Sequence, residues 1–285
     1  MRRLYPLLFV LLWSTGFIGA KYGLPYAEPL TFLSLRYVLV IVLMTALALA
    51  TRASWPSDLR TVVHIGVTGI LIHGIYLGGV FTSIHHGLPA GIASLVVGMQ
   101  PLLTALGAGW LLGERVTRRQ WLGLMLGFAG VAMVVSGKFG HVALAQLGAM
   151  LLPALAALFG ITLGTLYQKR FCPGFDLRTG SVLQFIPTLA LTAMLAASTE
   201  SMTIDWNPHF AFALGWLVLV LSLGAVSLLN VLIRSGNAVN VASLFYLTPP
   251  CTALMAWALF GETLGAVALV GMALAVSGVA MARRG

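Results

Sequence analysis

The chain has 285 residues, of which 59% are hydrophobic and only 8% are charged, and its mean hydropathy is +0.98. Soluble domains carry roughly 25% charged residues, so this composition excludes a protein that folds in water alone. The net charge of +9 does not indicate nucleic-acid binding, because the lysines and arginines lie in short links between apolar runs. The only two cysteines, Cys172 and Cys251, do not indicate a disulfide framework.

Apolar runs follow one another along the whole chain. A helix that crosses a bilayer needs about 20 mostly apolar residues. Runs of this kind lie near residues 4–23, 30–50, 61–83, 88–112, 119–137, 146–168, 178–198, 210–233, 238–260 and 264–282. The first run follows two arginines, as in a signal peptide, but it shows no evident small-residue cleavage site, so we interpret it as a retained helix. The sequence predicts an all-α integral membrane protein with ten transmembrane helices.

The basic residues predict the orientation of these helices. If both termini are cytoplasmic, all but three of the 16 lysines and arginines fall on the cytoplasmic side. The three exceptions, Lys21, Arg36 and Lys138, then fall on the outer side. An excess of basic residues in cytoplasmic links is the positive-inside pattern. We therefore predict a multi-pass protein of the cell inner membrane.

An internal repeat relates the two halves of the sequence. Residues 101–133 match residues 249–281 at an offset of 148 positions, with 14 of 33 positions identical, including Gly113-Glu114 and Gly261-Glu262. Upstream, the segment from Gly87 to Leu95 matches the segment from Gly236 to Leu244. We predict two five-helix repeats, residues 1–140 and 141–285.

The odd number of helices in each repeat predicts that the two halves are inverted. The second half then enters the membrane from the opposite side, so that Gly113-Glu114 lies inside and Gly261-Glu262 lies outside. Inverted repeats are typical of secondary transporters, in which two interchangeable halves enclose a site at mid-depth. This pattern is the strongest indication of function that the residues provide on their own.

Several motifs resemble a known family. They are Leu12-Trp13-Ser14, Arg36 in the second run, and two copies of a proline followed twelve residues later by Gly-Glu and then by another glycine. Together they resemble the EamA-type branch of the drug/metabolite transporter superfamily. The resemblance implies a cavity lined by the first, third, fourth, sixth, eighth and ninth helices. It also implies export of amino acids or other small metabolites.

Aromatic and polar residues deep in the apolar runs are the candidates for substrate binding. Pockets for small molecules combine an apolar, aromatic lining with a few polar groups, and polar residues inside a membrane are functional candidates. The candidates are Trp13, Ser14, Phe17, His73, Tyr76, Gln100, Asn230 and Tyr246. His73 and Tyr76 share one helix face, and a packing role for His73 remains equally open.

Prolines and small residues indicate how helices bend and pack. Pro101, Pro249 and Pro250 interrupt the fourth and ninth runs near mid-depth and free backbone carbonyls, which predicts either hinges or simple kinks. Small residues repeat at helical spacing in the fifth run and at the matching positions of the tenth. These are Gly123, Gly127, Gly130, Gly271, Ala275 and Gly278. They predict close packing of these two helices or a homodimer contact.

The positions of the charged residues limit the possible transport mechanisms and substrates. All seven carboxylates fall in links or at the ends of runs, so proton antiport would depend on His73, and a facilitator or an exchanger is equally open. Lys21 and Arg36 would suit a carboxylate, which favours an amino acid or a related metabolite as the substrate. We expect no cofactor, no metal site and no nucleic-acid partner. The expected partners are a small solute and the bilayer, and the protein is expected to be a monomer or a homodimer.

Three other functions compete with that of a carrier. An intramembrane enzyme would need catalytic residues clustered at membrane depth, and the sequence offers no such set. A channel would need a continuous pore, and a scaffold subunit would need a longer tail for its partner. The sequence therefore favours a secondary carrier that is not an enzyme.

Overall fold

The computed structural model describes residues 4–88, 90–136, 144–172, 174–235, 237–260 and 265–283. Within these residues the helices group into ten stretches that follow the ten predicted runs, which confirms the predicted fold class. Seven of the helical stretches are long and apolar enough to cross a membrane by length and composition alone. The predicted repeat boundary between residues 140 and 141 lies outside the described residues.

Six of the ten spans are single regular helices. They are α1 (Tyr5–Gly23), α2 (Pro29–Ala50), α7 (Arg118–Ser136), α8 (Leu144–Phe171), α9 (Leu177–Thr199) and α14 (Ala266–Arg283). A short 3-10 turn, η2 (Leu24–Tyr26), follows α1. The side chain of Asp176 caps α9 by accepting a hydrogen bond from the Arg178 backbone nitrogen. Proline stands in the first turn of both α1 and α2, where its missing N–H costs nothing.

The other four spans are interrupted near their middle. The third consists of α3 (Leu59–Gly69), the π-helical segment η3 (Ile70–Leu77) and α4 (Gly78–His85), and the eighth of α10 (Pro208–Trp216), the π-helical segment η4 (Leu217–Ala225) and α11 (Val226–Ser235). The fourth consists of α5 (Ala90–Val97) and α6 (Gln100–Leu112). The ninth consists of α12 (Ala238–Ser243), the 3-10 turn η5 (Leu244–Leu247) and α13 (Thr248–Phe260). The prolines predicted to interrupt the fourth and ninth helices therefore stand directly after real breaks.

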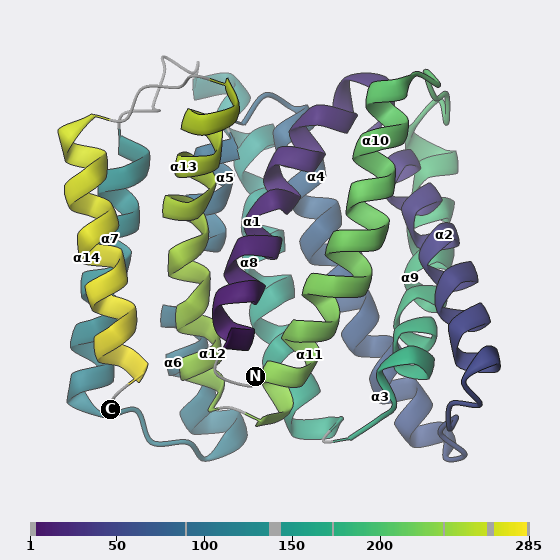
Figure 1. Ribbon diagram of the computed structural model, residues 1–285, viewed down its shortest axis with the longest axis horizontal. Coiled ribbons are helices and arrows are strands. Elements are labelled where there is room, and N and C mark those ends of the chain that lie inside the picture. The colour runs from purple at the N-terminus through teal and green to yellow at the C-terminus, as the bar shows by residue number, and fades with distance from the viewer. Residues whose placement is uncertain are drawn as a thin grey trace.

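Matching helices of the two halves run in opposite directions. In Figure 1 the chain descends through α5 and α6 but ascends through α12 and α13. The π-helical segments η3 and η4 also occupy matching positions at the 148-residue offset. This symmetry extends the repeat to the third and eighth helices, beyond the region of clear sequence identity. Gly261 and Glu262 themselves lie outside the described residues.

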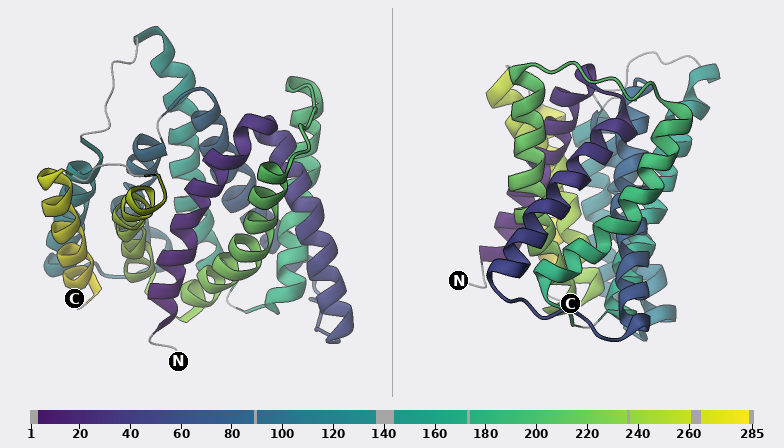
Figure 2. Two further views of the ribbon diagram at one scale, coloured as in Figure 1. Left: turned by 45° about the horizontal axis from the view of Figure 1, so that its top comes forward. Right: turned by 90° about the vertical axis from the view of Figure 1, so that its right-hand side faces the viewer.

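The stripes of small residues in the fifth and tenth helices face each other inside one chain. A Cβ atom on Gly123 would lie 2.5 Å from the backbone nitrogen of Ala282, and one on Gly130 would lie 2.4 Å from that of Ala275. Such distances leave no room for any side chain, so the two backbones touch. The predicted packing of the fifth helix on the tenth is confirmed, and Figure 2 shows α7 and α14 side by side at one end of the molecule.

A second pair of regular helices, α2 and α9, forms the opposite end of the molecule (Figure 1). At one face Glu200 accepts hydrogen bonds from the backbone nitrogens of Leu30 and Thr31, 2.8 and 2.7 Å away, and so caps α2. At the other face the Thr179 hydroxyl donates to the Ser54 carbonyl, 2.8 Å away. The pair is therefore fastened at both ends, and the interrupted helices lie between the two regular pairs.

The basic residues follow the predicted asymmetry with one correction. The links and helix ends at the face where Figure 1 shows both chain ends carry Arg52, Arg60, Arg115, Arg118, Arg119, Lys169, Arg170, Arg178 and Arg234. Placing Arg36 on the outer side was wrong, because this residue lies within the 22-residue α2 and is fully buried. Lys138 lies outside the described residues.

Candidate substrate-binding site

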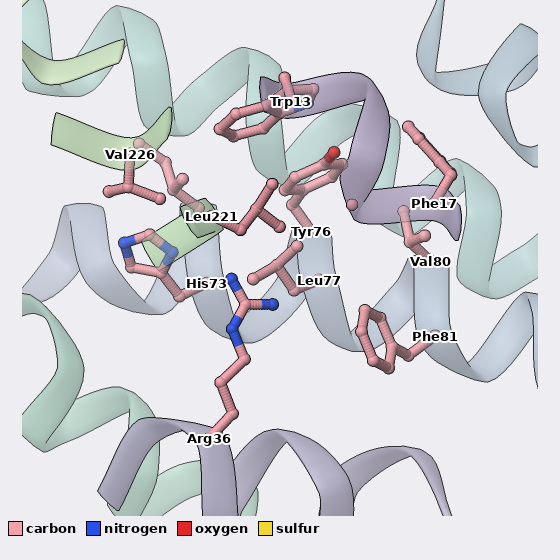
Figure 3. Close-up of a pocket in the computed structure, with 12 residues that line it drawn as sticks. Trp13, Phe17, Arg36, His73, Tyr76, Leu77, Val80, Phe81, Leu221 and Val226 are labelled. Atoms are coloured by element: carbon pink, nitrogen blue, oxygen red, sulfur yellow. The ribbon is translucent and has the colours of Figure 1, made fainter. Parts of the chain in front are cut away.

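A small cavity lies in the middle of the molecule, between both halves (Figure 3). Its free volume is about 20 Å³, which is room for about one water molecule. It is lined by Trp13, Gly16, Phe17, Arg36, Ile72, His73, Tyr76, Leu77, Val80, Phe81, Leu221 and Val226. These residues come from α1, α2, the third span and the eighth span. The lining from α2 differs from the expectation, which did not include the second helix.

Aromatic rings form one wall of the cavity. The rings of Trp13 and Tyr76 are stacked, with centroids 6.1 Å apart and planes 8° from parallel. Trp13 also meets Phe245 of η5 edge to face, with centroids 5.4 Å apart. These contacts place a broad apolar surface beside the few polar groups of the cavity, which is the usual composition of a small-molecule pocket.

Arg36 brings a buried positive charge to the cavity. Its Nε donates a hydrogen bond to the Ser222 hydroxyl of η4, 3.0 Å away. Its Nη1 and Nη2 atoms are buried and have no hydrogen-bond partner among the described residues, and Figure 3 shows the guanidinium pointing between His73 and Leu77. A buried charge without a partner is costly, so these two donors make Arg36 a candidate group for binding an anion.

His73 lies beside Arg36 in the π-helical segment η3. Its ring is fully buried and stacks on Phe185 of α9, with centroids 4.2 Å apart and planes 16° from parallel. Neither ring nitrogen makes a hydrogen bond within the part of the chain that the structure describes. The sequence left a packing role open for this residue, and the structure shows both a packing contact and two unused polar atoms facing the cavity.

A ladder of amide side chains continues from the cavity toward the face with the basic residues. Gln184 Nε2 donates to Thr68 Oγ1 at 3.0 Å and to Gln168 Oε1 at 3.4 Å. Gln168 Nε2 in turn donates to Asn230 Oδ1 at 2.8 Å. All four residues are buried. The ladder joins α3, α8, α9 and α11 and gives the interior a polar track at membrane depth.

The predicted binding residues divide into two groups. Trp13, Phe17, His73 and Tyr76 line the central cavity together, whereas the other four lie outside it. Ser14 Oγ is 2.7 Å from its acceptor, the Val10 carbonyl, and Gln100 Nε2 donates to Thr165 Oγ1 at 3.4 Å beside another small cavity. Asn230 belongs to the amide ladder.

Tyr246 does not line the central cavity and packs against α7 instead. Its ring is so close to Gly127 that a Cβ atom there would lie 2.6 Å from Tyr246 Cδ2. Conversely, Arg36 lines the cavity, although from the sequence it was named only as a group that would suit a carboxylate and not among the predicted binding residues. Its position in the middle of an apolar run was the available signal.

Polar contacts join the two halves at the face with the basic residues. The Glu114 carboxylate accepts hydrogen bonds from the Ala238 backbone nitrogen, at 3.1 and 3.3 Å, and lies 3.7 Å from the Lys169 ammonium. Lys169 Nζ also lies 3.5 Å from the Ile233 carbonyl oxygen. These contacts join the link after α6 to α8, α11 and α12.

Over nearly its whole length the chain is similar to known transport proteins. The EamA-like transporter family model matches residues 4–136 and again residues 147–284. The chain is 26% identical over its whole length to the uncharacterized inner membrane transporter YedA of Escherichia coli, of which it covers 92%. It is 28% identical to a probable amino-acid metabolite efflux pump of Salmonella typhimurium, with 96% of this chain and 91% of that protein covered.

Two further similarities concern another relative and the fold. A probable terminal-alkyne amino-acid exporter of Streptantibioticus cattleyicolor is 28% identical, with 97% of this chain and 91% of that protein covered. A protein of known crystal structure has the same fold, with a TM-score of 0.78, 22% identity, and coverage of 98% of this chain and 95% of that one. The chain is thus a multi-pass membrane transporter, not an enzyme, and it belongs to the EamA-like transporter family.

Proposed function

We propose that this protein is a secondary carrier that exports a small organic metabolite, an amino acid or a related carboxylate, by alternating access. The observation that carries the proposal is the mid-depth cavity lined by residues of two inverted halves, each with interrupted helices beside it. Halves of this kind can exchange conformations around a fixed site. The cavity would then open to one face and afterwards to the other.

A row of small cavities supports a path that is closed in this conformation. A second cavity of about 10 Å³ shares Trp13 and Phe17 with the central one, and a third of about 10 Å³ shares Phe245 with the second. The third reaches Gln100 and Lys169. None holds more than about one water molecule, so passage of a solute requires the surrounding helices to separate.

Two observations support a carboxylate as the cargo. Arg36 offers unpartnered donors in the central cavity, and two relatives are named as probable transporters of amino acids or their metabolites. Lys21 was predicted to assist Arg36, but it lies at the end of α1 and does not line the cavity. Arg36 is therefore the group that supports this substrate class.

The proposed location is the cell inner membrane, with both termini cytoplasmic. The support is the gathering of basic residues at the face with both chain ends and the inner-membrane relative. The oligomeric state stays a prediction of monomer or homodimer. Because the small residues of α7 and α14 are used inside one chain, they no longer argue for the homodimer.

Transport by the purified protein in liposomes tests this proposal. Liposomes preloaded with an unlabelled amino acid should take up the labelled compound faster than empty ones, and uptake should saturate. Repeating the assay with a pH gradient separates proton antiport from exchange. Flux that never saturates would indicate a channel, and no movement of any amino acid or related carboxylate would contradict the proposal.

A further inference from the structure

The charge of the central cavity specifies the substrate class more closely than the proposed function does. This inference rests on that function. We propose that the site prefers a monocarboxylate with an apolar body and no ammonium group, bound through the two free Nη atoms of Arg36. An acid related to an amino acid but lacking its charged amino group has this chemistry. Three features of the cavity carry the argument: its donors, its net charge and its apolar wall.

The donors of Arg36 fit a carboxylate in geometry as well as in charge. A guanidinium presents two parallel N–H groups that match the two oxygens of a carboxylate. The Nε hydrogen bond to Ser222, 3.0 Å long, holds one edge of the guanidinium on η4 and leaves Nη1 and Nη2 free. The guanidinium is fully buried, so water competes weakly for these donors.

The net charge of the site distinguishes a monoanion from an amino acid. Arg36 is the one charged side chain in the lining of the cavity, and no carboxylate of the described residues lies within a membrane helix away from its ends. Glu262 lies outside the described residues. A monocarboxylate would neutralise Arg36, whereas a zwitterion would bring an ammonium for which the lining offers no anion. An unpaired buried charge is unfavourable, which favours the monoanion.

Neutral acceptors in the lining offer the ammonium an incomplete alternative. The ring nitrogens of His73, which lines the cavity, are buried and make no hydrogen bonds to the described residues. Such dipoles can accept hydrogen bonds from an ammonium, but they do not cancel its charge as a carboxylate would. They suit equally well a hydroxyl or another neutral donor on the substrate, so they do not overturn the preference for a monoanion.

The remaining lining favours an apolar body. Trp13, Phe17, Leu77, Val80 and Phe81 give the cavity that the guanidinium enters a lining of carbon (Figure 3). Burial of apolar surface contributes roughly 25 cal/mol per Å², so a ring or branched chain on the substrate adds to affinity there. A short polar acid would leave this wall without a partner.

Three probes with the same phenyl ring separate the charge types. They are 3-phenylpropionate, which has only the carboxylate, L-phenylalanine, which has both charges, and 2-phenylethylamine, which has only the ammonium. Their binding to the purified full-length protein is measured by ligand-induced thermal shift and by competition for labelled 3-phenylpropionate. We expect 3-phenylpropionate to bind at least about tenfold more tightly than the other two.

Two substitutions then assign the preference to Arg36. Arg36→Gln should weaken 3-phenylpropionate binding at least about tenfold and remove its advantage over 2-phenylethylamine, whereas Arg36→Lys should restore part of it because the charge remains. The matched control is Ser222→Ala, which removes the hydrogen bond to Arg36 Nε but keeps the charge. If Arg36 only held η4 in place through Ser222, then Ser222→Ala would weaken 3-phenylpropionate binding as strongly as Arg36→Gln.

The outcomes separate this inference from the proposed function. If L-phenylalanine binds as tightly as 3-phenylpropionate, or if Arg36→Lys and Arg36→Gln both leave the order of the probes unchanged, the inference is wrong. Transport of amino acids by the same preparation would then leave the proposed function standing. If neither amino acids nor the three probes are transported, the proposed function fails as well.

Discussion

At the scale of single residues, Trp13 lines both the central cavity and its neighbour, as Phe17 does. Trp13 also stacks on Tyr76. Trp13→Leu should weaken binding of a phenyl-containing acid about fivefold, because an aromatic contact contributes roughly 0.5–1.5 kcal/mol. The affinity from competition binding checks this value. Trp110→Leu is the control, because Trp110 is 90% exposed, and equal losses from both variants would contradict a role of Trp13 in binding.

The sequence predicted only part of the site at this scale. Trp13, Phe17, His73 and Tyr76 were found because aromatic and polar residues in apolar runs are conspicuous, and His73 and Tyr76 share a helix face. Ser14 and Tyr246 have the same appearance in sequence, but their neighbours come from other helices: Thr252 donates to the Ser14 carbonyl at 3.3 Å, and Tyr246 packs on Gly127. Such contacts between distant segments leave no local pattern.

At the scale of elements, the contact between α7 and α14 depends on the absence of side chains. Gly123→Ala or Gly278→Ala should lower the thermal unfolding midpoint of the detergent-purified protein, because overpacking typically costs about 1–3 kcal/mol. A Cβ atom at Gly278 would lie 2.4 Å from the Gly127 backbone nitrogen. The matched control is Gly215→Ala in α10, where a Cβ atom meets nothing within 4 Å. An unchanged midpoint in the first two variants would contradict the close contact.

The break between α5 and α6 offers a second test at this scale. Pro101→Ala permits a continuous helix from Ala90 to Leu112, so we expect slower transport with nearly unchanged substrate affinity if the break is a hinge. The transport rate at saturating substrate, compared with the affinity from binding, measures this. Pro187→Ala changes a proline inside the regular helix α9 and serves as the control. An unchanged transport rate in Pro101→Ala would show that the break is a structural kink and not a hinge.

Only some of the helix breaks could be predicted from the sequence. Proline marked the breaks in the fourth and ninth helices, because it cannot donate the backbone hydrogen bond. The π-helical segments in the third and eighth helices carried no comparable sign, since Ile70–Leu77 and Leu217–Ala225 consist of residues that also form regular helices. Their symmetric positions indicate that the architecture imposes them on both halves.

At the scale of the whole molecule, two regular helix pairs enclose four interrupted helices. The α2–α9 and α7–α14 pairs stand at opposite ends (Figures 1 and 2), and all four irregular spans lie between them. Hydrophobic length and the internal repeat were enough to predict ten helices in two inverted halves. The size of the cavity and the polar contacts at one face were not predictable, because they involve residues far apart in the sequence, such as Glu114 and Ala238, that join the two halves.

The alternate opening of the central cavity is tested most directly by labelling one cysteine from each side of the membrane. Val80 lines the cavity, and Val80→Cys, with Cys172 and Cys251 both replaced by serine, places a single thiol there. In liposomes, a membrane-impermeant maleimide applied from either side should label this thiol, and a transported solute should slow both reactions. Labelling from only one side, whether the solute is present or absent, would contradict alternating access.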